Sequence, residues 1–139
     1  MNPTPAGWPR LSPGLICDDP KAEIEFLIRA FGFEARIIVE EGGVVHHSEL
    51  VYGEALVMVG GARRERSASP RSVGGKNTQS CFLYVDDVDA HYVRARAEGA
   101  TILTELADVD YGPEHWADRG YECLDPEGHR WFFATRLRG

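Results

Sequence analysis

The chain has 139 residues, of which 43% are hydrophobic and 27% charged, and its formal net charge is −7. This length suits one compact domain, and the acidic balance argues against general binding to nucleic acid, which requires a basic face. No apolar run approaches the roughly 18 residues of a membrane span, and the first residues lack the basic start and apolar core of a signal peptide.

The chain contains three cysteines, Cys17, Cys81 and Cys123. They are odd in number, widely spaced and set in apolar runs, which predicts buried free thiols in a reducing cytoplasm. None has a base adjacent in the sequence, so the pattern does not favour cysteine catalysis.

The first half of the chain predicts a strand, a helix and three further strands. Residues 1–10 are an extended Pro- and Gly-rich arm, followed by a short apolar strand at 11–17. Asp19 and Pro20 start a helix, because a carboxylate accepts free backbone N–H groups and proline fits the first turn. Gly32 ends this helix as a left-handed cap. Strands follow at 33–40, 44–51 and 55–59, with a tight turn at Gly53 between the last two.

Residues 60–76 interrupt this pattern because they lack apolar periodicity. We favour a solvated linker; a loop that grips an anion is the alternative, since the segment is rich in basic side chains. Gly74-Gly75-Lys76 lacks the spacing of a phosphate-binding loop. The basic residues are Arg63, Arg64, Arg66, Arg71 and Lys76.

The second half repeats the first. A strand at 80–85 leads into a helix at 90–98 capped by Asp86-Asp87 and ended by Gly99. A strand at 101–106, a polar and aromatic loop at 108–119 and a hairpin at 121–133 follow. The hairpin turns at Asp125-Pro-Glu-Gly128, where proline and glycine each suit a turn position.

Matching signals in the two halves recur at a nearly constant spacing. The Asp pairs lie 68 residues apart, the helix-ending glycines 67 apart, and the turn glycines Gly53 and Gly128 lie 75 apart. This spacing predicts an α+β fold of two βαβββ modules, each a sheet with a helix on its outer face. We expect one domain over residues 1–139, with modules at 11–60 and 78–135 and a linker at 61–77.

Four stretches point to a known family: Ala30-Phe-Gly-Phe-Glu34, His47-Ser-Glu-Leu-Val-Tyr-Gly-Glu54, Val85-Asp-Asp-Val-Asp89 and Asp125-Pro-Glu-Gly-His-Arg-Trp131. With the repeat, the chain resembles the glyoxalase/bleomycin-resistance (vicinal oxygen chelate) superfamily, and within it the PhnB-like branch. The resemblance covers about residues 11–134. It implies paired βαβββ modules, curled mixed sheets around a pocket, and a homodimer.

The resemblance also implies where a divalent metal would be held. The first-strand ligand lies seven residues before the second acid of each Asp pair, which is Ser12 and Ser80. The last-strand ligand lies four residues after each turn glycine, which is Val57 and Phe132. Hydroxyls are poor ligands and the other two side chains cannot bind, so we expect no metal at this site and no cofactor.

Two sets of polar residues are candidates for chemistry. His47 and Glu122 are 75 residues apart, so the repeat predicts matching positions for a base and an acid; satisfying buried polar groups or facing solvent is the alternative. His46, His47 and Glu49, completed by His115 or His129, would be a relocated metal site. Scattered histidines are more often surface or core residues.

The loop before the last hairpin carries Tyr111, His115 and Trp116. These side chains suit a lid that stacks on a planar ligand, or an anchor of Trp116 in the core or a dimer interface. Arg130 shares strand parity with Phe132, so it faces inward to receive an anion, or it pairs with Glu122 across the hairpin. His129 and Trp131 have the opposite parity and pack under the helix.

These features favour a metal-free small-molecule binding protein that sequesters a planar or amphipathic compound, without nucleic-acid or membrane partners. The acidic balance favours cationic ligands, as in drug-sequestering members by resemblance. The alternatives are a lyase, isomerase or dioxygenase of the superfamily with a site around His47 and Glu122, and a partner-binding domain. The predicted ligand-contacting residues are Ser12, His47, Tyr111, His115, Trp116, Glu122, Arg130 and Phe132.

Overall fold

The computed structural model describes residues 1–63 and 65–139. The first module consists of β1 (Gly14–Cys17), α1 (Pro20–Phe26) continued by a π-helical turn η1 (Leu27–Phe31), β2 (Glu34–Glu41), β3 (Val44–Tyr52) and β4 (Ala55–Gly61). A 3₁₀ turn η2 (Pro70–Val73) precedes the second module, which consists of β5 (Cys81–Tyr84), α2 (Val88–Ala97), β6 (Thr101–Asp110), β7 (Ala117–Leu124) and β8 (Arg130–Arg138).

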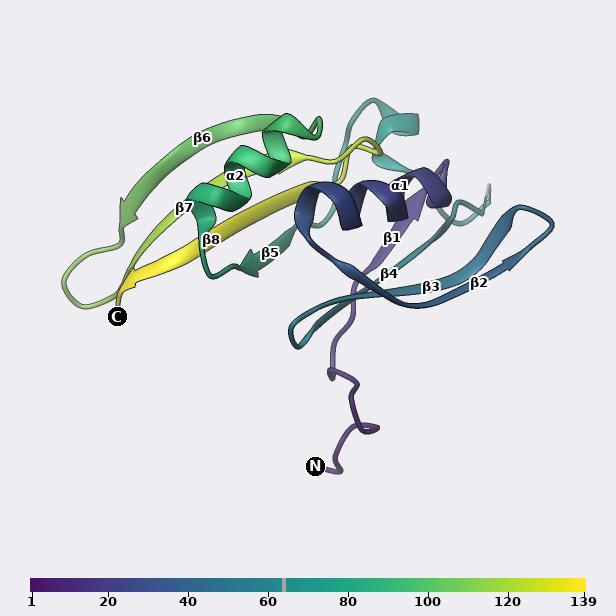
Figure 1. Cartoon of the computed structure of the whole chain (residues 1–139), viewed down its shortest axis with the longest axis horizontal. Coiled ribbons are helices and arrows are strands. Elements are labelled where there is room, and N and C mark those ends of the chain that lie inside the picture. The colour runs from purple at the N-terminus through teal and green to yellow at the C-terminus, as the bar shows by residue number, and fades with distance from the viewer. Residues whose placement is uncertain (64) are drawn as a thin grey trace.

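The two modules have the same topology. Their sheets have the strand orders β1-β4-β3-β2 and β5-β8-β7-β6. In each sheet the module's first strand pairs in parallel with its last strand, and the other pairs are antiparallel. Figure 1 shows the two separate sheets, each with its helix, and the N-terminal arm extending away from β1. The predicted α+β fold of two βαβββ modules is confirmed.

The predicted helix caps are confirmed, although α2 begins at Val88, two residues before the predicted start at residue 90. The carboxylate of Asp19 accepts the N–H of Ala22 at 3.1 Å, and that of Asp87 accepts the N–H of Ala90 at 3.0 Å. Each contact satisfies a backbone donor that the helix leaves free. Gly32 then reverses the chain with φ of 83°, which a side chain would oppose.

One core joins the two modules on the helix side of their sheets. The ring of Phe31 from the first module lies 5.3 Å from Trp131 and 4.8 Å from Phe133 of the second. His91 donates from Nε2 to the carbonyl of Phe31 at 3.0 Å and accepts the hydroxyl of Tyr121 at 2.7 Å. Burial lowers the pKa of His91 to about 4, so the ring is neutral, as these two contacts require.

The predicted loop at 108–119 is wrong, since β6 runs to Asp110 and β7 begins at Ala117. Arg119 on β7 bonds Asp108 at 2.8 Å, and Arg138 on β8 bonds Asp110 at 2.6 Å. Acidic and basic side chains on neighbouring strands form ion pairs with one another here. The polar residue types alone did not indicate that these residues form strands. No helix in the described ranges is both long and apolar enough to span a membrane.

Part of the predicted solvated linker is packed against the fold instead. Ser69 is fully buried, and its hydroxyl donates to Asp18 at 2.9 Å. The backbone N–H of Arg71 donates to the carbonyl of Glu127 at 2.9 Å. This turn therefore connects the start of α1 to the β7–β8 hairpin. Arg64, named above among the basic residues, lies outside the described residues.

Candidate functional site

An aromatic cluster lies on the face of the second sheet that is turned away from α2, called here the second open face. Strand alternation places Phe82, Tyr84 and Phe132 on this face, whereas Trp131 and Phe133 point into the core. Phe82 stacks on Phe132 with ring centroids 5.1 Å apart, and Tyr84 meets Phe82 at 4.9 Å. Phe82 is 51% exposed and Tyr84 45%. These contiguous exposed rings make the second open face a candidate binding surface.

Paired charges lie beside these rings. Arg130 forms an ion pair with Glu122 and holds the pKa of that carboxyl below its usual range. The guanidinium of Arg136 donates to Asp118 at 2.6 Å and lies 5.1 Å from the ring of Tyr84. The face therefore offers a ligand both stacking surfaces and fixed polar groups. Of the two roles predicted for Arg130, receiving an anion or pairing with Glu122, the structure shows the pairing with Glu122.

Tyr111, His115 and Trp116 lie together in the turn between β6 and β7. The rings of Tyr111 and Trp116 are 5.5 Å apart, and His115 meets Trp116 at 6.0 Å. Trp116 is 42% exposed, so it does not anchor the turn in the core. Arg136 lies 5.2 Å from the ring of Trp116 and also contacts Tyr84, which places this turn at the edge of the second open face.

The corresponding face of the first sheet, the first open face, carries a polar cluster beside the exposed apolar side chains of Ile37 and Val39. Glu49 is 2% exposed and accepts Arg36 Nε at 3.0 Å and His47 Nε2 at 2.8 Å. Trp8 of the N-terminal arm lies 4.1 Å from the guanidinium of Arg36. A carboxylate that orients a half-exposed imidazole is an arrangement suited to a general base.

His47 and Glu122 do not occupy matching positions, which corrects the prediction from the repeat. Glu49 pairs with Met58 across β3 and β4, and Glu122 pairs with Phe132 across β7 and β8. Glu49 is therefore the counterpart of Glu122. His47 lies on a different sheet from Glu122, and the two were not brought together.

The spacing misled because the two hairpin turns differ in length. The first turn has two residues between the paired Tyr52 and Ala55, and the second has five between the paired Leu124 and Arg130. The turn glycines consequently stand at different distances from the strand that precedes each turn, Gly53 one residue after Tyr52 and Gly128 four residues after Leu124. Equal spacing from the two glycines therefore does not identify matching strand positions, and a shift of one residue reverses the face to which a side chain points.

One of the four predicted metal positions faces the core. Val57 is 4% exposed in the core, so the residue that faces outward in its place is Met58. Ser12 precedes β1, Ser80 is exposed, and Phe132 is stacked on Phe82. A thioether, two hydroxyls and a phenyl ring do not fit a divalent metal of this family. We therefore derive no chemistry through such a metal.

The relocated metal site does not assemble either. His46 and His47 alternate to opposite faces of β3, His115 lies on the second sheet, and His129 bonds the carbonyl of Ile16 at 2.8 Å. In residues 1–63 and 65–139, no three His, Cys, Asp or Glu side chains are grouped so as to hold a metal ion.

The cysteines are poorly suited to nucleophilic chemistry. Cys17 and Cys123 are fully buried, and Cys81 is partly buried. Burial raises the pKa of Cys81 to about 11 and that of Cys123 to about 12. The reactive thiolate is therefore scarce at neutral pH.

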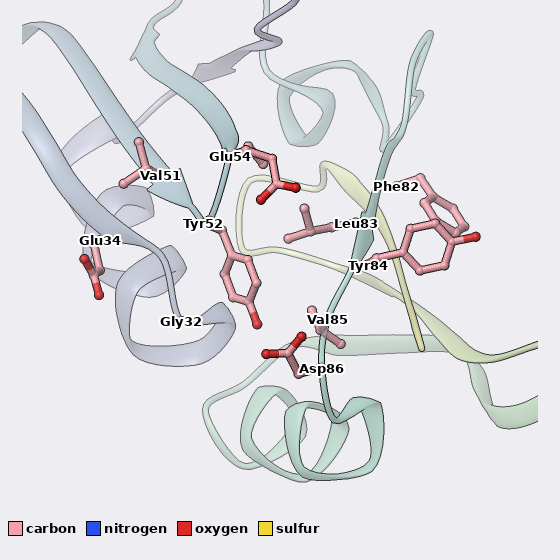
Figure 2. Close-up of a pocket in the computed structure, with 12 residues that line it drawn as sticks. Gly32, Glu34, Val51, Tyr52, Glu54, Phe82, Leu83, Tyr84, Val85 and Asp86 are labelled. Carbon is pink, nitrogen blue, oxygen red and sulfur yellow. The ribbon is translucent and has the colours of Figure 1, made fainter. Parts of the chain in front are cut away.

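A cleft of about 940 Å³ separates the β3–β4 turn from β5 and the start of α2 (Figure 2). Burial and the neighbouring carboxylate of Asp86 raise the pKa of Tyr52, so its phenol is a hydrogen-bond donor. Leu83 and Val85 form an apolar part of the wall. The lining residues are Gly32, Glu34, Val51, Tyr52, Gly53, Glu54, Ala55, Phe82, Leu83, Tyr84, Val85 and Asp86.

Sequence reasoning missed Phe82, Tyr84 and Arg136 as candidates. The order Phe82-Leu83-Tyr84 places both rings on one face of a strand, and this signal was available. Whether that face is open or buried depends on the packing of the helices, which the pattern does not specify.

Comparison with known proteins establishes the family. The model of the Glyoxalase/Bleomycin resistance protein/Dioxygenase superfamily matches residues 11–133. The chain belongs to this superfamily.

Individual relatives agree with this assignment. The uncharacterised protein Rv0887c of Mycobacterium tuberculosis is 33% identical over 94% of this chain and 76% of its own length. The structure of TioX from Micromonospora sp. ML1 is 30% identical, covers 91% of this chain and 95% of its own, and superposes with a TM-score of 0.71. A superfamily member from Alicyclobacillus acidocaldarius, 12% identical over 96% of both chains, shares the fold with a TM-score of 0.66.

Proposed function

We propose that this protein binds a planar or amphipathic small molecule without a metal, and that the second open face carries the ligand. The supporting observation is the cluster of Phe82, Tyr84 and Phe132. Phe82 stacks on Phe132 and meets Tyr84 edge-on, and the rings of Phe82 and Tyr84 are exposed to solvent while Phe132 is half-buried. Exposing these rings is unfavourable in water, and an aromatic ligand would cover them with both apolar burial and ring stacking.

Under this proposal, the residues predicted from the sequence to contact the ligand lie in two groups, one on each sheet. Tyr111, His115 and Trp116 close one end of the second open face, and Glu122 and Arg130 provide the polar contacts beside Phe132. Ser12 and His47 belong to the first sheet, and they reach the same ligand only if another copy's first sheet covers the second open face. We therefore propose that the protein is a homodimer, and that it is located in the cytoplasm. We also propose that it belongs to the PhnB-like branch and forms a single domain with modules at 11–60 and 78–135.

Equilibrium titration with two planar dyes, cationic proflavine and anionic anilinonaphthalene sulfonate, tests the binding proposal. The Phe82→Ala variant should weaken binding of at least one dye about tenfold, equivalent to about 1.4 kcal/mol of lost stacking and burial. Val93→Ala is the matched control, because Val93 is 65% exposed but lies on α2. Unchanged affinity in Phe82→Ala, or equal losses in both variants, would contradict the proposal.

The enzyme alternative rests on the His47–Glu49 pair on the first open face, 2.8 Å apart with His47 half-exposed. This pair replaces the predicted pair of His47 with Glu122, which lie on separate sheets. A superfamily reaction that the wild type catalyses and that is lost in His47→Gln would favour this alternative. Retained activity in His47→Gln would exclude it.

A further inference from the structure

The cleft of Figure 2 has an occupied counterpart in the other half of the molecule. The repeat brings each hairpin turn against the start of the other module's helix. At one junction the β7–β8 turn packs on the start of α1, and at the other the β3–β4 turn faces the start of α2 across the cleft. These will be called the closed junction and the open junction.

A carboxylate fills the closed junction. Glu127 is 2% exposed and accepts the backbone N–H groups of Asp18 at 2.8 Å and Asp19 at 2.9 Å. Arg71 supplies the positive charge, with its Nε 3.3 Å from Asp18 Oδ2 and its Nη2 3.6 Å from Glu127 Oε1. An anion and a cation, both provided by the chain, therefore satisfy this helix start together.

The open junction presents the same groups without these partners. Asp86 and Asp87 are the counterparts of Asp18 and Asp19, and within the described residues their backbone N–H groups have no acceptor. The carboxylate of Asp86 likewise has no basic partner there, and neither has that of Glu54. Figure 2 shows the side chains of Asp86 and Tyr52 turned toward each other in the cleft.

We propose that the open junction binds a zwitterionic amino acid or amino-acid-like compound. Its carboxylate would take the place that Glu127 has in the closed junction, on the N–H groups of Asp86 and Asp87. Its ammonium would take the place of Arg71, against the carboxylates of Asp86 and Glu54. Both charges of a zwitterion find partners here, whereas a simple anion would be repelled by the acidic wall and a simple cation would leave the N–H groups of the exposed Asp86 and Asp87 to water.

The cleft walls favour an aromatic or apolar side chain on this ligand. Tyr52, Phe82 and Tyr84 line the cleft together with Leu83 and Val85. Phe82 and Tyr84 also belong to the aromatic cluster of the second open face, whereas Glu54 and Asp86 line only the cleft and Phe132 and Arg130 lie outside it. Substitution of Asp86 therefore tests this site separately from the proposed function.

Amide chemical-shift titration of the full-length protein tests this inference with three probes. L-phenylalanine carries both charges, N-acetyl-L-phenylalanine only the carboxylate, and L-phenylalaninamide only the cation. L-phenylalanine should shift the amide signals of Asp86 and Asp87 saturably, and each half-analogue should bind at least about tenfold more weakly. The Asp86→Asn variant keeps the N–H and should weaken L-phenylalanine binding about tenfold, whereas Asp18→Asn should leave it unchanged.

Three results would overturn the inference. One is the absence of shifts at Asp86 and Asp87 up to about 10 mM L-phenylalanine, well above a millimolar dissociation constant. Another is equal affinity for L-phenylalanine and either half-analogue. The third is unchanged binding in Asp86→Asn, whose own amide spectrum reports whether it is folded. If Asp86→Asn is unfolded, Glu54→Gln takes its place, with a severalfold loss expected and no loss overturning the inference.

Discussion

The closed and open junctions hold the same place in two copies of one module, yet one is packed and the other is hollow. The difference lies in the turns. The five-residue turn at 125–129 is long enough to carry Glu127 onto the start of α1, whereas the two-residue turn at 53–54 leaves the start of α2 uncovered. The repeat thus determines the arrangement of strands and helix in each module. The length of the hairpin turn then decides whether a helix start is covered by the chain or is available to a ligand.

The closed junction also buries several acidic side chains. Asp125 is 4% exposed, and its carboxylate accepts N–H groups from Glu127, His129 and the indole of Trp131. Glu23 is 1% exposed beside it, and neither of its oxygens has a hydrogen-bond partner within the described residues. Backbone and indole donors, together with the cation of Arg71, compensate for charge that burial would otherwise disfavour.

The largest expected effect follows from removing Asp125. Asp125→Ala leaves three buried or half-buried donors without an acceptor, so we expect a loss of about 4 kcal/mol in the free energy of unfolding. Chemical denaturation measures it. Glu54→Ala, on the turn of the open junction, should stay within about 0.5 kcal/mol of the wild type. Similar losses in the two variants would mean that the junctions do not differ as described.

A smaller loss is expected for Glu127→Gln. The amide keeps one oxygen acceptor but loses the charge that attracts Arg71 and the two N–H groups, which should cost about 2 kcal/mol. Hydrogen exchange at the amides of Asp18 and Asp19 should accelerate at the same time. Glu54→Gln is the control, and protection that persists at Asp18 and Asp19 in Glu127→Gln would argue against the carboxylate's role.

The third prediction concerns pH. Burial, and the carboxylates of Asp125 and Glu127 beside it, raise the pKa of Glu23 well above its ordinary value. The native state therefore holds a proton that the unfolded state releases near pH 4.5. This contribution to stability is complete below that pH and decreases as the pH rises toward the native pKa.

Glu23→Gln removes this ionisation and should flatten the dependence of stability on pH. The advantage of the variant over the wild type should increase steadily from pH 5 to pH 9. Thermal unfolding across this range measures it, with Glu25→Gln on the exposed side of α1 as control. A constant difference between wild type and Glu23→Gln would show that Glu23 is ionised in the native state.

The smallest effect is expected at the open junction without ligand. Asp86→Asn removes a carboxylate that has no basic partner within the described residues, so stability should change by no more than about 0.5 kcal/mol. In the wild type, the amides of Asp86 and Asp87 should exchange much faster than those of Asp18 and Asp19. Equal protection at both pairs would indicate that something in the chain already covers the start of α2.

The local signals in the sequence were sufficient for most of the fold. Asp19 and Asp87 cap their helices and Gly32 ends the first one, because these roles depend on only a few neighbouring residues. The repeat and the order of strands followed from those anchors. The loop expected at 108–119 failed because Asp108 and Asp110 are paired across strands with Arg119 and Arg138, contacts that no local pattern contains.

The candidate site was less predictable. Val57 was assigned to a metal-ligand position and His47 was matched with Glu122 because both inferences measured from a turn glycine, and the two turns differ in length. The ion pair of Arg130 with Glu122 was one of two alternatives that strand parity left open. The exposed rings of Phe82 and Tyr84 depend on which sheet face the helices cover.

The sequence by itself determined the repeat, the helix limits and the superfamily, since these rest on local backbone preferences and on spacing. Only the tertiary structure decided that Glu127 fills one helix start while the other borders a cleft, and that one sheet face carries stacked rings and the other a buried carboxylate. The reason is physical: these features arise from contacts between residues tens of positions apart, and a change of one residue in a turn reverses which side chains can make them.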